Sequence, residues 1–93
     1  MGNKGLFPFM KRGQVSDCNT IKQAGLYYIQ NSALNSPFPG LYGELIVTDH
    51  FSDSSWVIQI AIQTRGANLY FRSTGGSFDG VPWYELKGTK VEL

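Results

Sequence analysis

The feature that most constrains the fold is a strictly alternating run near the middle of the chain, at residues 56–63. One set of alternate side chains is large and apolar throughout: Trp56, Ile58, Ile60 and Ile62. The other set is mixed: Val57, Gln59, Ala61 and Gln63. Because successive side chains of a strand point to opposite faces, this period of two predicts a β-strand with two unlike faces. The apolar stripe is predicted to face the core, which places Trp56 inside.

Similar runs lie on both sides of this strand, and glycine-rich or proline-containing turns separate them. Strands are predicted over residues 26–30, 43–48, 56–63, 68–73 and 81–86. A tight turn at Arg65-Gly66 is expected to join two of them as a hairpin. The connections are short, and a parallel pair needs a crossover of a dozen or more residues, so antiparallel pairing is expected. The predicted fold class is mainly β, with a small antiparallel sheet of about five strands.

One short helical turn is expected before the first of these strands, within residues 16–25. Asp17 is placed to accept a hydrogen bond from a backbone amide of the first turn, as an N-cap residue does. Ile21 is expected to point inward. Gly25 suits the left-handed residue that ends a helix.

The chain has 93 residues, enough for one domain. Residues 1–16 are interpreted as a leader or linker, since glycines and a proline interrupt regular structure there. Its apolar side chains Leu6, Phe7 and Phe9 are expected to pack on the module or on a neighbouring chain. Residues 17–87 form the predicted β module, and residues 88–93 are a short exit.

Composition excludes several classes of function. The net charge of +1 lacks the basic footprint of a nucleic-acid-binding protein. The single cysteine, Cys18, allows no intrachain disulfide and is expected to act as a small buried hydrophobe. No apolar run is long enough to cross a membrane, and no signal peptide is recognisable, so synthesis in the cytoplasm is expected. No cofactor and no metal site are predicted.

Acidic residues offer two candidate chemistries, and both are disfavoured. His50 with Asp49 and Asp53 falls in one predicted loop, where aspartates commonly serve turn geometry. A glycosidase needs two carboxylates facing each other across roughly 5–10 Å. Nothing in the sequence brings any two of the available acids together: Asp17, Glu44, Asp79 and Glu85. The chain is therefore predicted not to be an enzyme, with a small polysaccharide hydrolase as the least favoured alternative.

Aromatic residues are the remaining candidates, because their faces suit either a core or a sugar. The predicted glycan surface consists of Tyr70, Arg72, Trp83 and Tyr84, and other tyrosines such as Tyr27, Tyr28 and Tyr42 could extend it. Arg72 has two interpretations. It could contact an anion or sugar. Alternatively it could have a structural role, either over Trp83 as a cation–π partner or bonded to loop carbonyls, and this role is favoured.

Taken in order, these residues resemble the knob domain of R-type pyocin and bacteriophage tail fibres. The resemblance covers residues 17–87, and the matching positions are Asp17, Asn19, Gly25, Tyr27, Tyr28, Pro37 or Pro39, Gly43, Leu45, Val47, Val57, Gln59, Tyr70, Arg72, Trp83 and Leu86. The chain departs from the family at Phe78, where a first tryptophan is often found.

The resemblance implies a non-enzymatic structural module of a phage or prophage tail fibre. Residues 1–16 would then be a remnant of the fibre shaft. It also implies a homotrimer within the parent fibre and a location in the virion or a phage-tail-like particle. Structural positions would be Asp17, Asn19, Gly25 and Gln59. The alternative is a carbohydrate-binding module that contacts bacterial surface polysaccharide through exposed aromatics.

Overall fold

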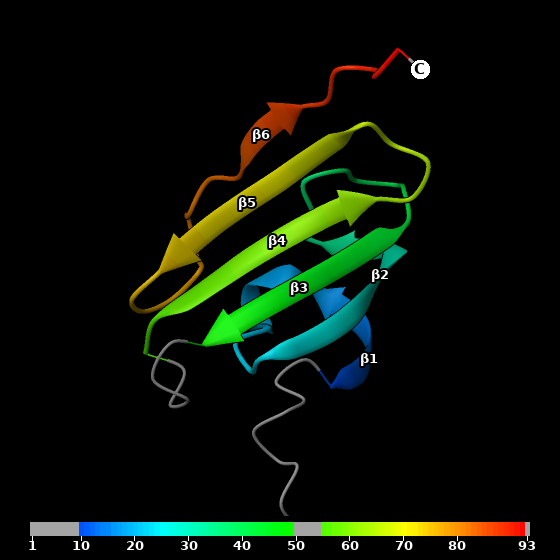
Figure 1. Ribbon diagram of the computed structural model, residues 1–93. Helices are drawn as coiled ribbons and strands as arrows, with labels where there is room; N and C mark the ends of the chain where they lie inside the picture. Colours follow the sequence, from blue (N-terminus) through cyan, green and yellow to red (C-terminus); the bar gives the residue numbers. More distant parts are fainter. Residues whose placement is uncertain (1–9, 50–54, 93) are drawn as a thin grey trace, which may run out of the picture.

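The computed structural model describes residues 10–49 and 55–92, which form one six-stranded sheet with a short 3-10 turn (Figure 1). The elements are β1 (Lys11–Asp17), η2 (Cys18–Thr20), β2 (Gly25–Leu34), β3 (Gly43–Asp49), β4 (Val57–Gln63), β5 (Asn68–Thr74) and β6 (Tyr84–Lys87). The strands lie side by side in chain order, and each pair from β2 to β6 is antiparallel. The prediction of a mainly β fold is confirmed, with six strands where about five were expected.

The N-terminal part of the sheet differs from the prediction. Residues 11–17 form β1, which pairs with β2 in parallel, so treating all of residues 1–16 as a leader was wrong for residues 11–16. Gly13 does not end the element. Its φ of +108° accompanies a register shift, as in a bulge, and the strand continues past it.

A parallel neighbour was not expected, because parallel pairs usually need a longer crossover. Residues 18–24 make this connection. The three residues of η2 rise about 2 Å each and the four that follow reach about 3.3 Å each when extended, roughly 20 Å in all. A strand of the length of β1 also rises roughly 20 Å, so the connection has about the length needed to return to the start of β2. Asp17 caps the turn as predicted, with its carboxylate accepting from the Asn19 amide. Gly25 begins β2 and does not end a helix, which corrects the prediction made for it.

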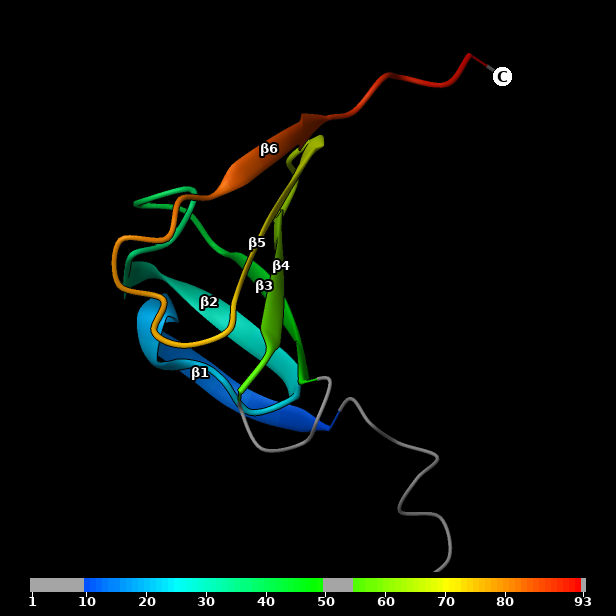
Figure 2. The same ribbon diagram turned by 90° about the vertical axis from the view of Figure 1, so that its left-hand side faces the viewer.

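Only one face of the sheet carries the core. This inner face contributes Ile29, Leu45, Val47, Val57 and Ala61, all buried. Val15 from β1, Cys18 from η2, and Phe38 and Phe78 from the connecting loops close over it. Figure 2 shows the sheet nearly edge-on, with these connections gathered on one side of it.

The opposite face, here called the outer face, faces the viewer in Figure 1 and is covered by no described element. The strand register assigns it thirteen side chains: Leu26, Tyr28, Glu44, Ile46, Thr48, Ile58, Ile60, Ile62, Leu69, Phe71, Ser73, Tyr84 and Leu86. The isoleucines of β4 therefore lie on the outer face, and Val57, Gln59 and Ala61 lie inside. Trp56 is 58 % exposed, so its predicted place in the core was wrong.

Candidate functional site

Arg72 is the centre of a buried polar cluster on the inner face. It lies in the middle of β5, where alternation turns it inward, and it is only 3 % exposed. Its Nε donates to Gln59 Oε1 at 2.8 Å, Nη2 donates to Asn19 Oδ1 at 2.9 Å and Nη1 donates to the Val81 carbonyl oxygen at 3.1 Å. A buried guanidinium is tolerated only when such partners replace its water. Arg72 thus ties β4, η2 and the loop before β6 together.

Two aromatic rings enclose the guanidinium. Its central carbon lies 4.5 Å from the centre of the Phe78 ring and 4.3 Å from that of Trp83. Both distances are within the range of cation–π attraction. Trp83 is held in place by its Nε1, which donates to the Asn35 carbonyl oxygen at 3.0 Å. The favoured interpretation of Arg72 is confirmed: it lies over Trp83, and it also bonds to a loop carbonyl. Phe78 supplies the second ring.

A second layer of hydrogen bonds holds the partners of Arg72. Gln59 Nε2 donates to the carbonyl oxygens of Cys18 at 2.7 Å and Ile21 at 2.8 Å. Asp17 Oδ1 accepts from the Asn19 amide at 2.9 Å and from Asn35 Nδ2 at 2.8 Å. Asp17, Asn19 and Gln59, which the sequence marked as structural, therefore converge on one network around Arg72.

Gly25 lies apart from this network. A side chain there would place its Cβ 2.7 Å from the Met10 carbonyl oxygen, which accepts the Leu26 amide. Only glycine allows the chain to pass this closely.

Burial sets the electrostatics of the cluster. It lowers the pKa of the Arg72 guanidinium, while the nearby Cys18 and Asp17 favour the charged form. Burial raises the pKa of the Cys18 thiol to about 11, against an opposing effect of Arg72. A thiol with so high a pKa is protonated at neutral pH and is a poor nucleophile. Cys18 is a fully buried side chain, as expected of a small hydrophobe.

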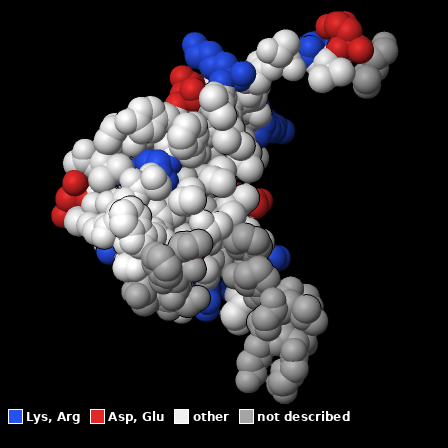
Figure 3. Space-filling view, turned by 60° about the vertical axis from the view of Figure 1, so that its left-hand side comes forward, with Lys and Arg blue, Asp and Glu red and all other residues white. Residues whose placement is uncertain are grey.

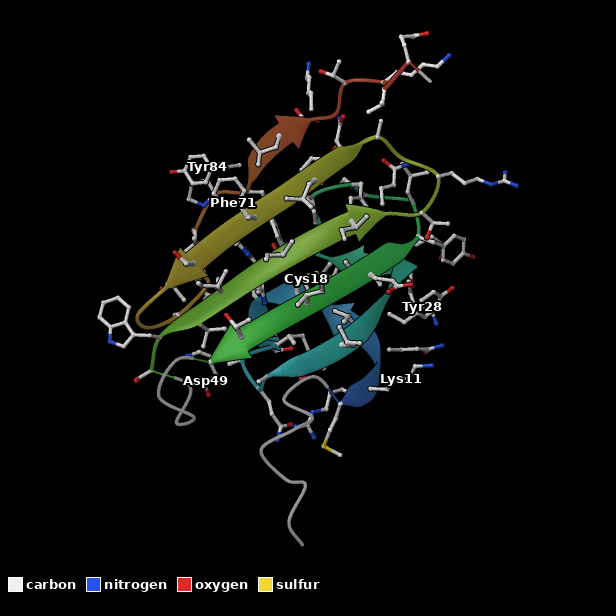
Figure 4. The ribbon with its side chains drawn as sticks, viewed as in Figure 1. Lys11, Cys18, Tyr28, Asp49, Phe71 and Tyr84 are labelled. Carbon is white, nitrogen blue, oxygen red and sulfur yellow. The ribbon has the colours of Figure 1, made fainter. Side chains whose placement is uncertain are left out.

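The four residues of the predicted glycan surface do not share one face. Arg72 and Trp83 belong to the buried cluster. Tyr70 also lies on the inner side, with its ring edge against Phe38 and its hydroxyl donating to Glu85 Oε2 at 3.1 Å. Tyr84 lies on the outer face, where its ring stacks on Phe71 with the centres 5.7 Å apart (Figure 4). Of the four, Tyr84 alone is an exposed residue.

A different aromatic pair is open to solvent. Tyr28 and Tyr42 are both exposed, and their rings are nearly parallel with the centres 6.1 Å apart. Beside Tyr28 is a hollow of about 310 Å³ whose lining includes Lys11 and Glu44. Figure 4 shows Tyr28 and Lys11 at the opposite end of the sheet from Phe71 and Tyr84. Both tyrosines were among the aromatic candidates from the sequence. Nothing in the local sequence, however, predicts that Tyr28 of β2 contacts Tyr42, which directly precedes β3.

Three of the four acidic candidate residues have structural partners. Asp17 and Asp79 both bond to Asn19, the latter through Asn19 Nδ2 at 3.3 Å. Glu85 accepts from Tyr70, and Glu44 lies on the outer face. Three hollows of the described residues each have a single carboxylate in their lining, Asp49 in one and Glu44 in the other two.

Over residues 10–49 and 55–92, no group of three potential metal ligands comes together. His50 and Asp53 lie outside the described residues, as do Leu6, Phe7 and Phe9. No described helix has the length and apolar character needed to cross a membrane. Charged side chains are also sparse on the side of the molecule seen in Figure 3.

Comparison with known proteins adds no relative. No family model matches the chain, and neither the curated proteins nor the solved structures contain a significant match. The resemblance to tail-fibre knobs therefore stays a prediction, and any function has to be argued from the geometry above.

Proposed function

We propose that this chain is a non-enzymatic structural module of a phage or prophage tail fibre, located in the virion or in a phage-tail-like particle. One observation carries the proposal. The polar residues that the resemblance singles out on the inner face, Asp17, Asn19, Gln59 and Arg72, bond to one another and to loop carbonyls. Their hydrogen-bonding groups are thus engaged in holding loops onto the sheet, which supports a structural role for them.

The rest of the molecule supports the same role. The described hollows offer no facing pair of carboxylates for glycoside hydrolysis. The one described thiol is buried and protonated. The exposed surface of the sheet is instead broad and apolar, which suits contact with another protein surface.

The proposal is tested on the particles themselves. Antibodies against the chain, applied to particles induced from the source strain, should place gold label on the tail fibres in electron micrographs. Pre-immune serum is the control. Particles that carry fibres but contain no trace of this chain by mass spectrometry would overturn the proposal.

A carbohydrate-binding role is the second candidate, and the exposed pair Tyr28–Tyr42 favours it. Two nearly parallel rings beside a hollow with one cationic and one anionic side chain could hold a sugar ring by stacking and by hydrogen bonds. Tyr84 offers a second exposed ring on the outer face. Trp83 does not, because it is held against Arg72.

A glycan array tests this role. Binding that is lost in Tyr42→Ala and kept in Leu34→Ala, an exposed residue away from the tyrosines, would support it. An array without a signal for the unmodified chain would exclude it. Trp83→Ala is a poor probe, since it removes one wall of the Arg72 site and disturbs the fold.

A further inference from the structure

The outer face has the anatomy of a protein interface. Residues that are register partners on neighbouring strands form rows across this face. The middle row crosses five strands, from β2 to β6, and every member is apolar: Leu26, Ile46, Ile60, Phe71 and Tyr84. The polar members stand at the margins, with Glu44 in one flanking row and Thr48 and Ser73 in the other. An apolar centre with a polar rim is the arrangement found in specific interfaces.

The area of this face reaches the size of an interaction patch. Six of its apolar side chains are 37–57 % exposed: Tyr28, Ile58, Ile62, Phe71, Tyr84 and Leu86. With a full area of roughly 150–250 Å² for each large side chain, these six present roughly 400–700 Å² of surface. The largest patch on a typical monomer is about 300–600 Å² and is often functional. A standard interface buries about 800 Å² on each partner, of which about 450 Å² is apolar, so this face is large enough for a stable complex.

We infer that the outer face is covered by the same face of another copy of this chain, so that copies associate sheet against sheet. The partner must offer a surface of similar area with almost no charge. The chain itself carries such a surface: Glu44 is the single charged residue among the thirteen, and Lys11 of β1 lies beside it at the margin, where both line one hollow. Sheets that pack face to face lie about 10 Å apart and interdigitate side chains such as these. This inference rests on the surface alone and does not depend on the proposed fibre function.

The apolar stretch Leu6–Phe9, which lies outside the described residues, is too short to cover the whole of this face. Five strands at a spacing of roughly 4.8 Å make it about 19 Å wide. The apolar stretch Leu6–Phe9 has four residues and spans at most about 14 Å when extended. Such a segment could lie along one row of side chains and would leave the other rows open.

The test uses the full chain and measures its mass by sedimentation equilibrium across a concentration series. The unmodified chain should form a closed dimer, because two copies that share one contact surface are related by a two-fold axis. Phe71→Lys places a charge in the middle row, at a position that is 37 % exposed, and should weaken association by at least about 30-fold. Leu34→Lys is the matched control. Leu34 is 63 % exposed and is paired with Asp17 of β1, outside the face, so this variant should associate normally.

Circular dichroism of each variant separates loss of association from loss of folding. If Phe71→Lys fails to fold, Leu86→Lys replaces it, because Leu86 is exposed on the edge strand β6. A chain that stays monomeric at the highest concentration, or a folded variant that associates as tightly as the unmodified chain, would overturn the inference. A dimer that Phe71→Lys dissociates would support the surface and count against a trimeric fibre, so the two proposals can fail separately.

Discussion

The two faces of the sheet differ in an unusual way: the apolar core of the inner face encloses two polar side chains, while the outer face carries exposed apolar ones. The inner face has a charged residue and an amide at its centre, Arg72 and Gln59, both buried. The outer face has isoleucines and aromatic rings, many of them exposed. In an antiparallel sheet with one solvated face, polar residues normally point outward. The polar side chains lie inside because the inner face is closed by loops, whose backbone groups need hydrogen-bond partners. The outer face binds no such loop of the described residues, and its apolar side chains suit contact with another sheet.

The inner face solves a specific problem. Residues 18–24 and 75–83 connect strands and are not part of the sheet, so their carbonyl groups need partners when they are buried. Gln59 and Arg72 supply those partners for Cys18, Ile21 and Val81. The outer face receives no such segment in the described residues, and apolar side chains are sufficient there.

Removing Arg72 should produce the largest effect. Arg72→Met keeps much of the apolar stem but leaves Gln59 Oε1, Asn19 Oδ1 and the Val81 carbonyl without their donors. We expect the free energy of unfolding to fall by about 3–5 kcal/mol, as when one partner of a buried charged network is removed. Urea denaturation followed by tryptophan fluorescence measures it.

Arg65→Met is the control for this change. Arg65 is exposed in the turn between β4 and β5, and its substitution should change stability by no more than about 0.5 kcal/mol. If Arg72→Met cost as little as the control, the network would be incidental to the inner face.

The second effect is a loss of stability at alkaline pH. The Cys18 thiol has its pKa raised from 9.0 to about 11 in the folded chain, because burial disfavours the thiolate. Below pH 9 the thiol is protonated in both states and its contribution is intact. Between pH 9 and 11 only the unfolded chain loses the proton, so stability should fall by about 2–3 kcal/mol.

Chemical denaturation at a series of pH values compares the unmodified chain with Cys18→Ala. The variant should show a shallower decline. It should keep some slope, because burial also raises the pKa of Tyr27 and acts in the same direction. If the free energy of unfolding fell equally steeply with pH in the two chains, burial would not be raising the pKa of Cys18.

The third effect is the loss of stability when a methyl group is added to the inner face. A Cβ at Gly43, on the inner face, would lie 2.5 Å from the Phe38 ring and in contact with the Ile62 carbonyl oxygen. Overpacking costs about 1–3 kcal/mol, which exceeds the roughly 0.4–1 kcal/mol that alanine gains by restricting the unfolded chain. Gly43→Ala should therefore destabilise the fold in thermal denaturation.

Ser73→Val is the counterpart on the outer face, where Ser73 is exposed. This variant should leave the stability of the dissociated chain within about 0.5 kcal/mol. A stable Gly43→Ala variant would mean that the inner face has room to relax.

Much of the sheet follows from local pattern. Alternation at residues 56–63 predicts β4 and its two faces, the Arg65-Gly66 pair predicts the hairpin, and Asp17 predicts the cap. The pattern cannot decide which face is buried, because a period of two is the same from either side. That choice depends on where the loops lie. It follows from contacts between Gln59 or Arg72 and segments far along the chain.

Two other features depend on distant contacts as well. β1 contains Gly13 and four exposed residues, so nothing local marks it as a strand, and pairing with β2 stabilises it. The Arg72–Trp83 contact was predictable, because an arginine beside aromatic residues in an alternating strand has few other places to lie. The Tyr28–Tyr42 pair was not, since its two residues meet only after the sheet has formed.

The smallest effect should come from the outer face, and two neighbours in β4 test it. Ile62→Thr removes apolar area from a side chain that is already exposed, so it should cost the dissociated chain no more than about 1 kcal/mol. Ala61→Thr buries a hydroxyl on the inner face and should cost about 1–3 kcal/mol. Denaturation at concentrations below association measures both. If Ile62→Thr proved the more damaging, the outer face would be covered by part of the same chain, and sheet-against-sheet association would lose its physical basis.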